Sequence, residues 1–168
     1  VKGQSVFRTI FYIPSVVSVV AASMVWVWVL NPSYGILNKF LMALGVPASS
    51  VPGWMYDPNW TKPALILMGM WGSGGMMLIF LASIKGVPQS LYEAAELDGA
   101  NAWKKFWHIT MPGISPAMFY QLVTGIIGMF QYFTQAYIFS ASSGNVSAQD
   151  GGPGNSMLFY ALHLYNQA

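Results

Sequence analysis

The chain of 168 residues carries seven Lys/Arg and five Asp/Glu, or 7% charged residues, and 55% of its residues are hydrophobic. An ordinary soluble domain has about 25% charged residues, and so few charges cannot cover the surface of a soluble fold. This composition excludes a solvated globular enzyme and also a disordered chain. A net charge of +2 is too small for a nucleic-acid-binding surface. The sequence contains no Cys, which excludes thiol chemistry, and its two His give little basis for a metal site.

Three long segments contain no charged residue: Thr9–Leu30, Pro63–Ile84 and Gly113–Phe139. A helix needs roughly 20 apolar residues to cross a bilayer. Three such segments in one short chain argue against buried helices of a soluble core. The sequence therefore predicts an all-α, polytopic transmembrane bundle, with spans at about 9–30, 63–84 and 113–139 and a fourth span that begins near Met157. Residues 1–168 are expected to form part of a single transmembrane domain.

The distribution of Lys and Arg predicts the orientation of these spans. If Val1 starts in the cytoplasm, five of the seven basic residues lie inside, and only Lys39 and Lys62 lie outside. Within the outer segment 31–62, a short amphipathic helix is predicted at Tyr34–Leu44, with Ser33 as its N-cap. Its apolar face has two possible partners, the membrane surface and the rest of the protein.

The inner loop 85–112 contains six of the charged residues. Helix formers predict one short helix at Gln89–Leu97, which Asp98-Gly99 ends because glycine accepts the left-handed conformation. A second short helix is predicted at Ala102–His108, and Met111-Pro112-Gly113 is expected to break it before the third span. Two short helices joined by a sharp bend would thus project from the membrane toward a soluble partner.

Within this loop, Glu93-Ala94-Ala95 is followed after three residues by Gly99, and after nine more by Ile109, with Pro112 three positions later. This spacing resembles the EAA signature of the membrane subunits of binding-protein-dependent ABC importers. Met111 stands where the family usually has Leu, a swap that conserves volume. The resemblance to sugar-type members covers nearly the whole chain, including Asn31-Pro32 and Tyr34-Gly35 as well as Gly151–Ser156. Since family members have six or more spans, this chain is expected to be an internal fragment.

The resemblance implies a non-catalytic permease subunit of the bacterial or archaeal cytoplasmic (inner) membrane. It implies no cofactor in this chain, because ATP is bound and hydrolysed by a partner ABC ATPase dimer. The other implied partners are a second permease subunit, an extracytoplasmic substrate-binding protein and the lipid bilayer. The sugar-type resemblance favours a heterodimer of permease subunits. Glu93 would make the charged contact with the ATPase, whereas Glu96 is interpreted as a solvated residue. The residues implied in ATPase coupling are Glu93, Ala94, Ala95, Asp98, Gly99, Ile109 and Pro112.

Polar residues inside the expected spans are candidates for the substrate path, because polar groups in a membrane are costly and often functional. In the second span these are Trp71 and Ser73; in the third they are Gln131, Tyr132 and Gln135. Gln131 and Gln135 are four residues apart and would share a helix face. Neutral amides and aromatic rings suit an uncharged, hydroxylated ligand such as a sugar. Close helix packing at Trp71–Gly75 and hydrogen bonding between helices remain alternatives.

Two function classes remain open. The first is a permease subunit of an ATP-driven importer for a sugar or oligosaccharide, and the second is a stand-alone channel or ATP-independent carrier. The intact EAA spacing favours the first. The loop at 140–150 is longer than in the family pattern and Met157 stands where Thr is common, so both are expected to bear on docking of the binding protein.

Overall fold

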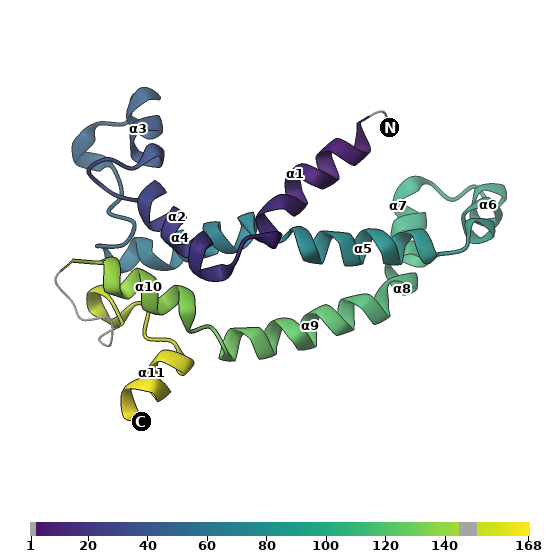
Figure 1. The fold of residues 1–168 in the computed structure, drawn as a ribbon. Coiled ribbons are helices and arrows are strands. Elements are labelled where there is room, and N and C mark those ends of the chain that lie inside the picture. The colour runs from purple at the N-terminus through teal and green to yellow at the C-terminus, as the bar shows by residue number, and fades with distance from the viewer. Residues whose placement is uncertain (1–2, 145–150) are drawn as a thin grey trace.

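The structure is a computed structural model that describes residues 3–144 and 151–168. All regular secondary structure in this part of the chain is helical (Figure 1). Three short elements accompany the α-helices: the 3₁₀ turns η1 (Ala48–Ser50) and η4 (Pro153–Asn155), and the π-helical turn η2 (Phe106–Thr110). The α-helices are α1 (Gln4–Val16), α2 (Val19–Val29), α3 (Ile36–Ala43), α4 (Pro58–Trp71), α5 (Gly74–Gly86), α6 (Gln89–Leu97), α7 (Ala102–Lys105), α8 (Met111–Gly113), α9 (Ser115–Phe130), α10 (Thr134–Ser142) and α11 (Tyr160–Gln167).

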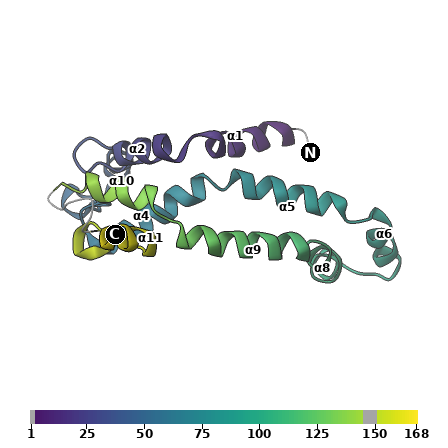
Figure 2. The ribbon, with the colours of Figure 1, turned by 60° about the horizontal axis from the view of Figure 1, so that its bottom comes forward.

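The helices form an elongated body with two distinct ends. Helix α5 packs between α1 and α9 in the middle of the molecule (Figure 2). Helices α6, α7 and α8 gather at one end, and α2, α3, α4, α10 and α11 gather at the other (Figure 1). The helices that carry Lys39 and Lys62 therefore lie far from the α6 end, as the orientation based on basic residues requires.

The hydrophobic core lies at the end opposite α6. Leu30, Met55 and Phe139 are completely buried there, and burial of each such side chain contributes about 1.5–3 kcal/mol. Met157 also has no exposed surface and belongs to this core. The Met157 side chain therefore presents no surface to a partner, and its expected bearing on docking of the binding protein stays a prediction. Of the stretch 140–150, residues 145–150 lie outside the described residues.

The three expected spans are not single straight helices. No single helix among the described residues is both long and apolar enough to cross a membrane. Three bent pairs have the required length and composition together: Ser5–Val16 with Val19–Val29, Pro58–Trp71 with Gly74–Gly86, and Ala102–Gly113 with Ser115–Phe130, bent by 100°, 48° and 62°. The sequence predicted the approximate places of these segments but not the bends.

One of the bends follows from local chemistry, and a second lies at a close contact between helices. Pro14 removes a backbone donor near the end of α1, and the ring of an interior proline clashes with the carbonyl four residues earlier, which bends or ends the helix. Ser18 then begins α2, because its side chain accepts a hydrogen bond from the Ala21 N–H at 3.3 Å. Between α4 and α5, Gly74 lies directly against α1, and a Cβ there would collide with the Phe11 carbonyl oxygen.

The third expected span is interrupted twice. A bend at Ile114 precedes α9, and residues 131–133 separate α9 from α10. The expected helix over 113–139 is therefore wrong in its continuity. The predicted break at Met111-Pro112-Gly113 is also displaced, since these residues form α8 and the chain turns only after them.

Helix α3 begins later than predicted. Its N-cap is Gly35, not Ser33, because the Asn31 side chain accepts hydrogen bonds from the Ser33 N–H at 2.9 Å and the Tyr34 N–H at 3.3 Å. These two bonds form an Asx turn that places Ser33 outside the helix.

The apolar residues of α3 divide between two environments. Leu37 and Leu41 pack against the core, and the buried Asn38 side chain accepts a hydrogen bond from the Trp54 indole at 2.7 Å. Packing on the protein itself is thus confirmed for this side of the helix. The large apolar residues that stay exposed are Ile36, Phe40, Met42 and Leu44.

Candidate functional site

The loop with the EAA spacing forms a projecting helix at the end of the molecule. Helix α6 covers Gln89–Leu97, as predicted, and follows Pro88, whose ring suits a helix start. Glu93 and Ala94 are exposed on it, and Leu97 keeps 91% of its surface exposed. A single exposed leucine is ordinary on a protein surface, so the exposure of Leu97 shows only that this residue is accessible.

Gly99 ends α6 with a well-defined cap. Its φ of +71° lies in the left-handed region that glycine favours. The Gly99 N–H donates to the Glu96 carbonyl at 3.0 Å and the Ala100 N–H donates to the Ala95 carbonyl at 2.9 Å. These two bonds form a Schellman motif, which fixes the direction in which the chain leaves the helix. Asp98 is exposed at this turn.

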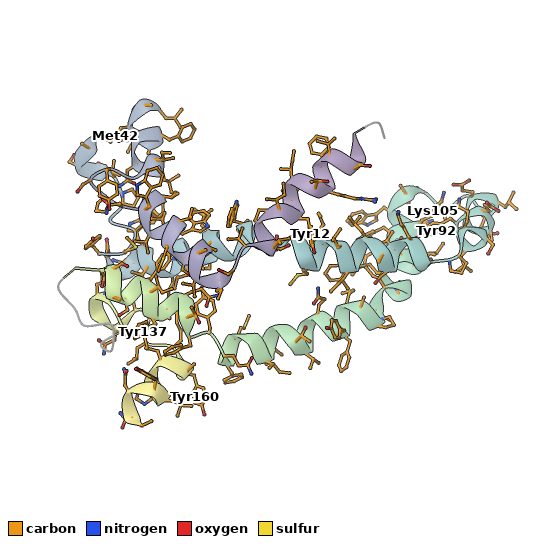
Figure 3. All side chains as sticks on the ribbon, in the orientation of Figure 1. Tyr12, Met42, Tyr92, Lys105, Tyr137 and Tyr160 are labelled. Carbon is orange, nitrogen blue, oxygen red and sulfur yellow. The ribbon has the colours of Figure 1, made fainter. Side chains whose placement is uncertain are left out.

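Two side-chain contacts fasten α6 to the helical segment that follows. Lys105 Nζ lies 2.6 Å from Glu96 Oε1, and the Tyr92 hydroxyl lies 2.8 Å from Thr110 Oγ1. Lys105 and Tyr92 are labelled at this end of the molecule in Figure 3. The Glu96 side chain is 65% exposed, so it is solvated as expected, and in addition it pairs with Lys105. Exposed ion pairs contribute only about 0–1 kcal/mol, so the part-buried Tyr92–Thr110 contact does more than the ion pair to hold α6 against the following segment.

The second short helix extends further than predicted. Asn101 caps α7 by accepting a hydrogen bond from the Lys104 N–H at 2.9 Å. The helix then continues through the π-helical turn η2 into α8, instead of ending at His108. Single π-helical turns occur often at functional sites. This segment leads directly to Pro112 and the bend before α9.

The fold brings together signature residues that are far apart in the sequence. A shallow depression of about 400 Å³ between α6 and α7 contains both Ala95 and Ile109. Small alanines leave room for close approach of another chain at this point. Glu93 and Ala94 lie on α6 outside this depression. The residues that line it are Ala95, Ala100, Lys104, Lys105, His108 and Ile109.

The substrate-path candidates separate into two cavities. Trp71 and Gln135 line a cavity of about 260 Å³ beside the α1–α2 bend, and the Trp71 ring packs edge-on against Trp26 at 6.0 Å between centroids. Ser73 does not line it, because its hydroxyl donates to the Met70 carbonyl at 2.7 Å.

Tyr132 lines a second cavity of about 450 Å³, where its ring packs edge-on against Phe159 at 5.3 Å. Gln131 is exposed at the C-terminus of α9 and lines neither cavity. The expectation that Gln131 and Gln135 share a helix face is wrong, because the helix is interrupted between them.

Sequence reasoning missed several residues around these cavities. Pro14 and Ser15 line the smaller cavity, Lys62 lines the larger one, and Gly69 lines both. Pro14 and Ser15 could have been found from the proline inside an apolar run. Such a proline marks a helix break, where backbone groups are free to form hydrogen bonds outside the helix. Gly69 leaves open space beside α4, since nothing lies within 4 Å of a Cβ placed there.

Residues 2–161 match the family described as binding-protein-dependent transport system inner membrane component. The chain belongs to this family, and its class is that of an all-α membrane subunit of ABC transporters. The EAA resemblance and the helical membrane fold are thereby confirmed.

Named relatives support the same assignment. The chain is 37% identical over 168 residues to the probable ABC transporter permease protein YesP of Bacillus subtilis, covering 99% of this chain and 51% of YesP. It is 33% identical over 166 residues to the lactose transport system permease protein LacF of Rhizobium radiobacter, covering 98% and 53%. The chain thus spans about half the length of the curated relatives it matches.

A solved structure shares the fold. The crystal structure of a bacterial ABC transporter involved in the import of the acidic polysaccharide alginate matches with a TM-score of 0.76 and 27% identity, over 99% of this chain and 57% of that chain. A second crystal structure, of a bacterial alginate ABC transporter with an alginate pentasaccharide-bound periplasmic protein, matches with a TM-score of 0.73 and 25% identity, over 96% and 59%.

Proposed function

We propose that this chain is part of a multi-pass permease subunit of an ATP-driven, binding-protein-dependent importer in the cytoplasmic (inner) membrane, and that the cargo is a sugar or oligosaccharide. The observation that carries the proposal is the α6–Gly99–α7 unit, which presents the EAA signature at one end of the molecule. Support for the cargo class comes from relatives named for lactose and for arabinooligosaccharide transport.

In this proposal, α6 is the coupling helix. ATP is bound and hydrolysed by a separate ATPase dimer, and its closure displaces α6 through contacts with Glu93, Ala94 and Asp98. The Schellman cap at Gly99 holds the bend, and the Glu96–Lys105 and Tyr92–Thr110 contacts make α6 move together with α7, η2 and α8. The displacement then reaches α9 at the bend beside Pro112.

The substrate path is proposed to run along the bent helix pairs, which serve as the membrane-crossing segments. Irregular backbone at membrane depth is tolerated where it lines a cavity. Trp71 offers an aromatic face for stacking on a sugar ring, and Gln135 offers a neutral amide in the same cavity. Tyr132 in the second cavity is a further contact, while Gln131 and Ser73 take part only if the path widens during transport.

The proposed assembly contains a second permease subunit, with a heterodimer favoured, and an extracytoplasmic binding protein at the end opposite α6. The alginate transporter with its bound periplasmic protein supports a binding-protein partner. At that end, Thr61 on α4 donates a hydrogen bond to Ser156 at 2.7 Å, which ties the segment after η4 to the body of the protein.

Affinity purification of the tagged, full-length parent protein from its host tests this proposal. Gentle solubilisation followed by mass spectrometry is expected to identify an ABC ATPase and a second permease. A binding protein recovered with them can then be tested for its sugar. Recovery of the parent protein alone, under conditions that preserve a known importer complex, would instead support a stand-alone channel or carrier.

A further inference from the structure

Half of the residues that line the depression between α6 and α7 are basic: Lys104, Lys105 and His108. Lys104 and His108 are exposed, and they lie four residues apart on the same side of the helical segment. The His108 Nδ1 lies 3.0 Å from the Lys104 carbonyl oxygen, and this contact holds the ring against the preceding turn. The depression therefore has a basic rim that belongs to α7 and η2.

One positive charge of this rim is not neutralised within the part of the chain that the structure describes. Lys105 pairs with Glu96 on α6 at 2.6 Å, and its side chain is only 18% exposed. Lys104, by contrast, is exposed and forms no ion pair with any described residue. The Lys105–Glu96 pair leaves no net charge, so Lys104 gives the depression a net positive charge.

The other half of the lining is apolar. Ala95, Ala100 and Ile109 are partly buried there, and the two alanines leave space above them. Apolar surroundings strengthen the attraction between opposite charges. A group that suits this depression has a short apolar stem and a negative end, as an aspartate or glutamate side chain has. A phosphate is typically held by arginine or by several backbone N–H groups, and the lining contains no arginine.

Charge is divided between the two halves of the projecting unit. Helix α6 and its cap carry Glu93, Glu96 and Asp98 and no basic residue, whereas α7 and η2 carry basic residues and no acidic one. The depression begins on α6 itself at Ala95, so a protein that covers α6 also borders the depression. Such a partner needs basic groups opposite α6 and an acidic group opposite Lys104. Docking in the reverse direction would bring like charges together, which is costly.

We propose that the depression receives an aspartate or glutamate side chain of the ATPase subunit, that its carboxylate pairs with Lys104, and that this pair sets which way round α6 lies on the ATPase. The inference rests on the proposed function, which makes the ATPase the partner of α6. It adds to the contact at Glu93 a second contact of opposite sign. Two contacts of opposite sign fix a direction, whereas one contact alone leaves α6 free to turn about it.

Cross-linking with a carbodiimide tests this pair, because the reagent joins an amine to a carboxylate only when the two are in contact. The full-length parent is assembled with its partners in its host membrane, treated, and digested for mass spectrometry. An amide bond is expected between Lys104 and an Asp or Glu of the ATPase. Lys104→Arg keeps the charge but lacks the reactive amine, so it should lose this product while the ATPase stays bound. Lys85, exposed at the end of α5 and outside the depression, is the internal control and should give no such product.

Charge reversal measures what the pair contributes to binding. An exposed ion pair is worth up to about 5-fold in affinity, and reversal adds repulsion, so Lys104→Glu is expected to weaken ATPase binding about 10-fold at low salt. Lys104→Gln should show a smaller loss, and high salt should reduce both losses because it screens the charges. Lys85→Glu, the matched control, should change the affinity less than 2-fold.

Three results would overturn the proposal. They are a cross-link from Lys104 to a carboxylate of the parent chain, no product at Lys104 although the ATPase is bound, and equal losses of affinity in Lys104→Glu and Lys85→Glu. Restored binding when the cross-linked ATPase carboxylate is replaced by lysine in the Lys104→Glu background would support it. Failure of the unaltered parent to bind any ATPase would instead contradict the proposed function itself.

Discussion

Replacement of Gly99 tests whether the bend after α6 transmits motion. A residue with a Cβ pays about 1–2 kcal/mol to adopt the left-handed conformation, which Gly99 holds at φ +71°. Nothing lies within 4 Å of a Cβ placed there, so the cost within this chain is conformational and not steric. A penalty of one to two kcal/mol changes the population of the capped state by about 5–30-fold.

The backbone preference of each replacement predicts how strongly it reduces coupled transport. Asparagine enters the left-handed region more readily than other non-glycine residues, and valine is β-branched and stiffer than alanine. The amount of sugar transported per ATP hydrolysed, measured in proteoliposomes with the full-length parent and its partners, is expected to fall in the order Gly99, Gly99→Asn, Gly99→Ala, Gly99→Val. ATPase subunits should remain bound in every variant.

The same series separates conformation from size. Asparagine is larger than alanine, so a steric clash with the ATPase would harm Gly99→Asn more than Gly99→Ala. That reversed order would refute the conformational reasoning, and unchanged coupling in Gly99→Val would refute the role of the bend altogether.

Three further predictions concern other contacts. Tyr92→Phe removes the bond to Thr110, worth about 0.5–1.5 kcal/mol, and is expected to lower transport per ATP several-fold while complex recovery stays unchanged. Trp54→Phe leaves the buried Asn38 oxygen without its donor, at a cost of about 1–3 kcal/mol, and is expected to lower the melting temperature of the solubilised complex without changing coupling. Gln135→Ala removes the amide from the smaller cavity and should slow sugar uptake while the binding protein still stimulates ATP hydrolysis.

Matched variants serve as controls. Tyr56→Phe removes an exposed hydroxyl that bonds to Ser142 far from α6, so equal losses in Tyr56→Phe and Tyr92→Phe would contradict a specific coupling role. Trp60→Phe changes a more exposed indole beside Trp54 and should leave the melting temperature nearly unchanged. Gln131→Ala alters an amide outside both cavities, and a larger transport defect there than in Gln135→Ala would show that the cavity assignment is wrong.

Helix α6 could be predicted from sequence because its signals are local. Pro88 before the helix and Gly99 after it fix the ends of α6 by backbone chemistry alone. The Glu96–Lys105 pair could not be predicted in the same way, since it depends on the angle between two helices. That angle is set jointly by the cap and by the Tyr92–Thr110 contact.

The bends within the apolar segments were harder to predict. Composition reports how much apolar sequence is available to cross a membrane, but it does not report whether the helix is straight. Pro14 marks one bend, whereas the interruption at residues 131–133 contains no proline or glycine. Its consequence is that Gln131 and Gln135 separate, and that Tyr132 and Gln135 line different cavities.

The proposed function depends above all on contact between α6 and an ATPase. A photo-reactive amino acid at Leu97, which is 91% exposed, tests it most directly in the full-length parent within its host membrane. Illumination is expected to link Leu97 to an ABC ATPase subunit, whereas the same group at Phe40, exposed on α3 at the other end, should not form this product. No ATPase adduct at Leu97, in membranes that actively import sugar through this protein, would contradict the claim.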